Sequence, residues 1–131
     1  MSNARYAALT GALGLTVNDL AEIGGFSDRF ARDLVSGRRP FPADVRQALD
    51  DLDDDSDVMV DEIIADVQEG AGAIWVFRSN AELRQHFPNW PGRGHARGGF
   101  VGPHRIAALA AIDQLNEDGV EVDLLFFDPP K

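Results

Sequence analysis

The sequence predicts an α+β fold in which an N-terminal helical bundle precedes a small βααβ unit. Apolar residues recur at helical spacing in the segments between residues 4 and 69. From residue 73 onward, two short β-type runs at 73–78 and 120–127 enclose two further helical segments. The periodicity changes at Gly70-Ala71-Gly72, so we expect one domain at residues 1–71 and a second at 72–131.

The N-terminal domain is expected to hold five helices separated by short turns. Thr16 is a predicted N-cap with Asp19 three residues later in an approximate capping box, and Ser27 is the N-cap of the next helix. Gly25 and Gly37 follow these two helices, as residues that tolerate a left-handed backbone. An acidic turn is expected before the last helix. The predicted helices span 4–13, 16–24, 27–36, a segment that starts at Pro42, and 56–69.

The second and third helices have the spacing of a helix-turn-helix. The small residue Ala21 is followed four positions later by Gly25 in the turn, and Ala31 and Leu34 then face the core. Arg29 lies near the N-terminus of the third helix, where a guanidinium can make two hydrogen bonds to guanine. Arg38 and Arg39, which follow this helix, are expected to contact phosphates of the DNA backbone. The predicted DNA-binding residues are Ser27, Asp28, Arg29, Arg32, Asp33, Ser36, Arg38 and Arg39.

The turn after the third helix carries a family resemblance. Residues 16–45 resemble the Cro/CI/Xre helix-turn-helix superfamily through Ser36-Gly37-Arg38-Arg39-Pro40 and the helix start Pro42-Ala43-Asp44-Val45. The layout of the whole chain is similar to the anti-CRISPR-associated autorepressors, although Leu34 and Val35 replace the Trp-Glu of that subfamily. The resemblance implies a sequence-specific, autoregulatory transcriptional repressor that binds an inverted-repeat operator in double-stranded DNA as a homodimer.

The C-terminal unit is expected to supply the dimer contact. We predict a strand at 73–78, a short helix capped by Asn80, a loop at 88–102, a helix at 104–117 opened by Pro103, and a strand at 120–127. Two strands form only a marginal sheet by themselves, and the last strand ends in a fully apolar run. The predicted dimerisation residues are Trp75, Phe77, Leu109, Ile112, Leu124 and Phe126.

The net charge of −10 is unusual for a DNA-binding protein, but it is unevenly distributed. Residues 1–41 carry five arginines against four acids, whereas residues 42–72 carry one arginine against eleven acids. The local patch decides docking more than the total charge. The alternative that the acidity keeps open is a non-enzymatic protein-interaction or RNA-associated module on the same scaffold.

Other classes of function find little support in the residues. The chain has no Cys, no signal-peptide pattern and no apolar run long enough to cross a bilayer, so we expect a cytoplasmic protein without a membrane contact. The acidic segment 51–62 resembles an EF-hand loop, but Ser56 stands where the loop needs Gly. The three histidines show no metal-ligand spacing. We therefore expect no enzyme activity, no cofactor and no metal site.

Overall fold

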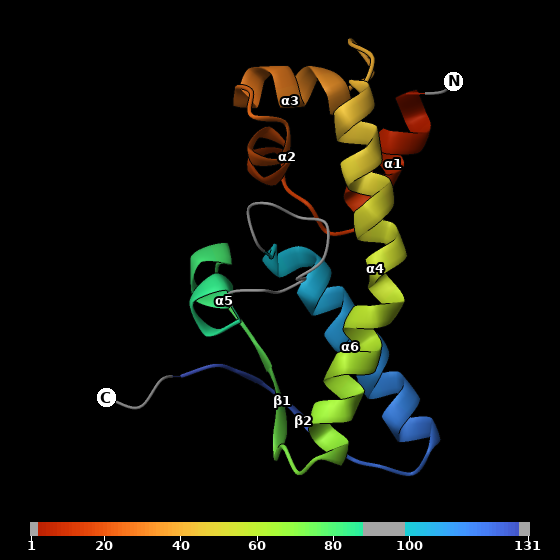
Figure 1. Cartoon of the computed structure of the whole chain (residues 1–131), viewed down its shortest axis with the longest axis vertical. Coiled ribbons are helices and arrows are strands. Elements are labelled where there is room, and N and C mark those ends of the chain that lie inside the picture. Colours follow the sequence, from red (N-terminus) through yellow and green to blue (C-terminus); the bar gives the residue numbers. More distant parts are fainter. Residues whose placement is uncertain (1–2, 88–98, 129–131) are drawn as a thin grey trace.

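The computed structural model describes residues 3–87 and 99–128 (Figure 1). Helices α1 (Asn3–Ala12), α2 (Val17–Gly24), α3 (Asp28–Val35) and α4 (Ala43–Gln68) come first. They are followed by strand β1 (Ala73–Val76), helices α5 (Asn80–His86) and α6 (Val101–Glu117), and strand β2 (Asp123–Phe126). The described chain is mostly helical with a small sheet, which is compatible with the predicted α+β class.

Helix α4 is continuous over 26 residues, so the expectation of two helices separated by an acidic turn is wrong. Its buried apolar residues follow spacings of three and four on either side of a gap between Leu52 and Met59, and Leu52, Met59 and Ile63 are all buried. Asp has low helix propensity, but this costs only about 0.5–0.7 kcal/mol per residue. The segment contains no Gly or Pro that would break the helix. Burial along one side of α4 therefore outweighs the weak preference of its exposed acids for a turn.

Two hydrophobic clusters lie along α4. This helix runs along most of the long axis of the molecule (Figure 1). The first cluster joins α1, α2 and α3 to the N-terminal half of α4 through residues such as Leu20, Leu34 and Leu49. The second joins the C-terminal half of α4 to β1, α5 and α6. The border between the clusters lies within α4, and α4 holds both parts of the chain together. A domain division at residues 71 and 72 stays a prediction.

The sheet consists of β1 and β2 in parallel, with Trp75 opposite Leu125 and Val76 opposite Phe126. Helices α4 and α6 pack on β1, and Ile74 and Val76 are buried there. All four residues of β2 are exposed. Both strands are shorter than the predicted runs at 73–78 and 120–127.

Two helices begin at other residues than the sequence predicts. The side chain of Ser79, not that of Asn80, caps α5 by accepting from the Glu82 N–H at 3.2 Å. Helix α6 starts at Val101 and includes Pro103 in its first turn, where the missing N–H of proline has no intrahelical acceptor in any case. Asn80 is thus released from capping and is free to bind elsewhere.

Candidate nucleic-acid interface

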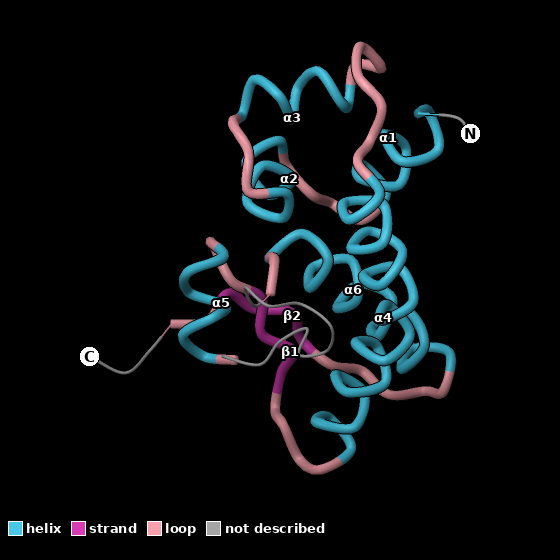
Figure 2. The backbone as a smooth tube through the Cα atoms, turned by 45° about the horizontal axis from the view of Figure 1, so that its top comes forward, coloured by secondary structure: helices cyan, strands magenta, loops and turns pink. Residues whose placement is uncertain are grey.

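Helices α2 and α3 pack against each other across a tight turn at the end of the molecule where α4 begins (Figures 1 and 2). The Thr16 hydroxyl accepts from the Asp19 N–H at 3.1 Å, and the Asp19 carboxylate accepts from the Thr16 N–H at 2.9 Å. Gly25 has φ +69°, a left-handed conformation without a Cβ penalty. Ser27 accepts from the Phe30 N–H at 3.1 Å and starts α3. The predicted capping box, turn and N-cap are confirmed.

Helix α3 is strongly two-sided. Ala31 and Leu34 are fully buried against the first cluster, and Phe30 and Val35 are partly buried beside it. This inner face orients the helix, since rotating it would expose both buried residues to water. The opposite face is left to solvent and carries Asp28, Arg29, Arg32 and Ser36. Asp33 is partly buried, where the sequence led us to expect an exposed side chain.

Two arginines on this outer face, and a third just beyond α3, form no ion pair within the described residues. Within residues 3–87 and 99–128, no ion pair within 4.0 Å involves Arg29, Arg32 or Arg38. Together with Asp33 and Ser36 they line an open depression of about 450 Å³. Three guanidinium groups around an open depression can donate hydrogen bonds to anionic groups such as phosphates.

The other predicted site residues are engaged within the chain. Arg39 makes an ion pair with Asp33 at 3.4 Å and lies over the ring of Phe30 at 5.4 Å. The amide of Asn18, oriented with its nitrogen toward the acid, donates to the Asp28 carboxylate at 2.7 Å. Asp28 and Asp33 thus have partners other than Arg29, Arg32 and Arg38, although Asp33 lines the same depression as these arginines.

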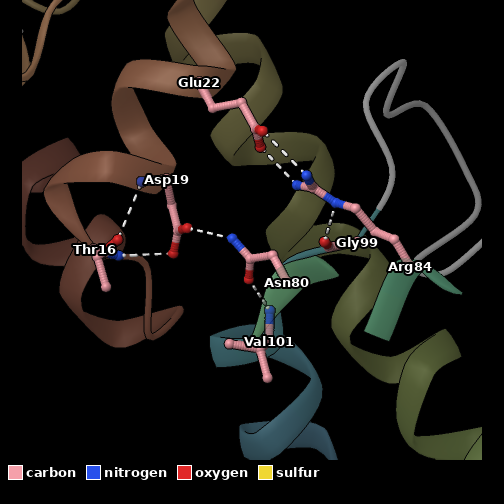
Figure 3. A network of polar contacts seen from close by, with 7 residues as sticks. All are labelled: Thr16, Asp19, Glu22, Asn80, Arg84, Gly99 and Val101. Carbon is pink, nitrogen blue, oxygen red and sulfur yellow. Dashed lines mark hydrogen bonds and ion pairs between the residues drawn. The ribbon is translucent and has the colours of Figure 1, made fainter. Parts of the chain in front are cut away.

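A polar network ties α2 to the C-terminal part of the chain (Figure 3). The Asp19 carboxylate, besides capping α2, accepts from the Asn80 side-chain amide at 2.7 Å. The Asn80 amide oxygen in turn accepts from the Val101 N–H at 2.8 Å. This N–H belongs to the first turn of α6, where it has no intrahelical acceptor. Asn80 therefore joins the starts of α2 and α6 with one side chain.

A second connection runs beside the first (Figure 3). Arg84 of α5 binds both carboxylate oxygens of Glu22, at 3.0 and 2.6 Å, in a bidentate ion pair. Its Nε donates to the Gly99 carbonyl at 2.9 Å, and its guanidinium lies over the ring of Phe100 at 5.0 Å. Bidentate arginine contacts fix direction as well as distance. The orientation of α2, and of α3 packed on it, is thus set from α5 and α6.

Sequence reasoning missed this network. Asn80 is 61 positions from Asp19 in the sequence, and Arg84 is 62 positions from Glu22, so no local pattern links the two partners of either contact. The only local indication is that Ser79 can replace Asn80 as the cap of α5, which leaves the Asn80 amide for another partner.

The predicted dimerisation residues do not form one surface. Phe77 is fully buried among the rings of Phe87, His104 and Phe127, so the prediction that it lies in an interface is corrected: it belongs to the core of the single chain. Trp75, Leu109, Leu124 and Phe126 are exposed, and Ile112 is partly buried. Trp75 shares a sheet face with Leu125, whereas Leu124 and Phe126 lie on the opposite face.

The described residues contain no group of three His, Asp or Glu side chains placed to hold a metal ion. Residues 51–62 are part of α4, so the EF-hand resemblance is contradicted by a helix in place of a loop.

None of the helices in the described ranges combines the length and apolar character needed to cross a bilayer. Most of the predicted loop at 88–102, with His95, lies outside the described residues.

The sequence matches no family model and no curated protein.

Proposed function

We propose that the chain is a sequence-specific DNA-binding protein that represses transcription from an inverted-repeat operator as a homodimer. The observation that carries the proposal is a depression lined by Arg29 and Arg32 of α3 and by Arg38 just beyond the helix, none of which has an ion-pair partner within the described ranges. In a chain of net charge −10, three such arginines on one face are a local exception to the overall acidity.

The roles of the arginines follow from their places on the helix. In the proposed complex the N-terminal part of α3 enters the major groove. Arg29, in the first turn of α3, makes two hydrogen bonds to guanine and contributes about 1–3 kcal/mol of discrimination. Arg38 follows the helix and contacts backbone phosphate, which positions the protein without reading sequence. Arg39, already tied to Asp33, contributes less.

Repression requires only that the dimer occupies its operator, without any chemical reaction. A dimer seated on a promoter excludes the transcription machinery from the same DNA. Two copies of α3 related by a two-fold axis read half-sites about one helical turn apart, roughly 34 Å. Linking the two copies makes the second contact intramolecular, which compensates for the few cations on each copy.

The second candidate is a protein-interaction module, and the acidic face of α4 favours it. Asp53, Asp54 and Asp57 are exposed on this helix, and such a surface repels phosphate and attracts a basic protein partner. On this alternative, α3 is a surface for a protein rather than for DNA.

Selection of binding sites from random double-stranded DNA separates the two candidates. The full chain is incubated with a library of random duplexes, and the bound fraction is amplified and sequenced over several rounds. The proposal predicts enrichment of an inverted repeat and a gel shift with the selected duplex. A library that stays random after selection at 50–100 mM salt contradicts DNA reading and leaves the protein-interaction module.

A further inference from the structure

The start of α6 is seated in the N-terminal part of the chain. Phe100, the residue before α6, is fully buried and belongs to the first cluster with residues of α1 to α4. Gly102 packs so closely on the backbone of Gly14 that a Cβ at Gly102 would collide with the Gly14 carbonyl oxygen. These two contacts fix the first turn of α6 against the loop between α1 and α2.

Helix α3 reaches the rest of the molecule through its neighbours. It packs mainly on α2 and α1, and α2 packs in turn on α4. Apolar packing has no preferred direction, so it resists separation of these helices more than it resists a small rotation. The polar contacts between α5 and α2 are directional (Figure 3), because Arg84 must meet both carboxylate oxygens of Glu22 at once. A rotation of α2, and of α3 with it, therefore breaks them.

Asp19 is the end of the second polar contact on α2. It is only 6% exposed, so its carboxylate needs donors from within the chain. One of its oxygens accepts from the Thr16 N–H and the other from the Asn80 amide. The Asn80 oxygen is itself bound by the Val101 N–H, so reversing the amide would lose both hydrogen bonds of Asn80. The Asn80 side chain thus has one orientation that satisfies both of its neighbours.

We propose that Asn80 and Arg84 are positioning residues of the candidate nucleic-acid interface: they hold α2, and the α3 face packed on it, in one orientation relative to α5 and α6. Neither residue is assigned a contact with DNA. A dimer gains affinity from its second copy only where both α3 helices meet their half-sites together, and looseness between them lowers the effective concentration of the second contact. The inference rests on the proposed homodimer, joined through the C-terminal part of the chain, and gives that part control over operator affinity.

Exchanging the side chains of Asp19 and Asn80 tests the contact without changing its shape. In Asn80→Asp two carboxylates face each other where the present atoms are 2.7 Å apart, so the contact is lost. The double variant Asp19→Asn/Asn80→Asp reverses donor and acceptor. Its amide at position 19 still accepts from the Thr16 N–H and donates to the carboxylate at position 80, which accepts from the Val101 N–H. The double variant also keeps the net charge of the natural chain.

The orientation is measured first without DNA. The natural chain contains no Cys, so introduced cysteines carry spin labels at chosen sites of the full chain. Ser36→Cys with Gln114→Cys reports the distance between the end of α3 and α6. Gln68→Cys with Gln114→Cys is the matched control, because both labels then sit on helices that pack in the second cluster. All three labelled side chains are exposed.

We expect the distance distribution between α3 and α6 to broaden in Asn80→Asp and to return to its natural width in the double variant. The control pair is expected to stay unchanged in every variant. A distribution in Asn80→Asp as narrow as that of the natural chain overturns the positioning role, and so does a broadening that the double variant does not reverse.

Binding to the selected inverted repeat and to a duplex with one half-site then separates positioning from damage to α3. With each variant shown to be folded by circular dichroism, Asn80→Asp and Arg84→Ala are expected to weaken binding to the repeat about tenfold or more. Half-site binding is expected to change by less than about twofold, and the double variant to recover the affinity for the repeat. Arg84→Lys keeps the charge but loses the bidentate contact, so it tests the same role in a less disturbed chain.

An equal loss on both duplexes overturns the positioning role, because damage to α3 itself weakens every contact alike. An unchanged affinity for the inverted repeat in Asn80→Asp and Arg84→Lys overturns the control of operator affinity. A selection that yields no operator overturns the proposed function, whereas the spin-label distances still decide whether Asn80 orients α3.

Discussion

Acidification is expected to destabilise the protein through His104, which begins the second turn of α6 and is only 2% exposed. Its ring lies 5.4 Å from the centroid of Phe77 and 6.4 Å from that of Phe87. Burial among these rings, with a smaller contribution from the adjacent Arg105, lowers the pKa of His104 to about 4. Asp66 is the carboxylate that lines the same small cavity.

The sign follows from where the unfolded and folded chains take up the proton. The unfolded chain protonates His104 near pH 6.5, whereas the folded chain does so only near pH 4. The contribution of His104 to stability is therefore full above about pH 6.5, decreases as the pH falls toward 4, and changes no further below it. The difference in pKa corresponds to about 3 kcal/mol in total, and about 2 kcal/mol of it is lost between pH 7.5 and pH 5.

Urea unfolding at pH 7.5 and at pH 5 measures this loss. The replacement His104→Phe keeps a ring between Phe77 and Phe87 but removes the titration, so it is expected to lose about 2 kcal/mol less than the natural chain on acidification. A His104→Phe variant that loses as much stability as the natural chain would refute the reasoning.

Three further predictions concern salt, the polar network and calcium. Arg38→Ala should weaken binding to all duplexes alike and reduce the slope of affinity against salt concentration by about one unit. A change in base preference with an unchanged salt slope would contradict a phosphate contact. Arg84→Ala should cost about 1–2 kcal/mol of unfolding free energy, and a cycle with Glu22→Ala should show a coupling of about 1 kcal/mol; additive effects would contradict the bidentate contact. Calorimetry with calcium should show no micromolar site, because residues 51–62 are helical; heat lost in Glu62→Gln would contradict this.

The local features of the candidate interface could be predicted from the sequence. The caps at Thr16 and Ser27 and the Gly25 turn are decided by residues within four positions of each other, and their residue types leave few alternatives. The two-sided character of α3 follows from the spacing of Ala31 and Leu34. Such features depend on the chain's own neighbours, so a reading of the sequence captures them.

Features decided by distant contacts could not be predicted in this way. The acidic residues of α4 favour a turn locally, but the segment is helical, with apolar residues packed on both sides of it, such as Leu52 in the first cluster and Met59 in the second. The burial of Phe77 depends on rings from α5, α6 and the end of β2. Asn80 has the residue type of a cap, but its amide binds Asp19 across the molecule. In each case tertiary contacts override a local preference.

The most direct test of the central claim is the base preference of Arg29 variants on the selected operator. Arg29→Ala is expected to weaken binding by about 1–3 kcal/mol and to relax the preference at one base pair of each half-site. Arg29→Lys is the matched control, because it keeps the charge but loses the planar pair of donors, so it should retain the salt slope while losing the same discrimination. Affinity and base preference unchanged in Arg29→Ala would contradict the placement of α3 in the major groove.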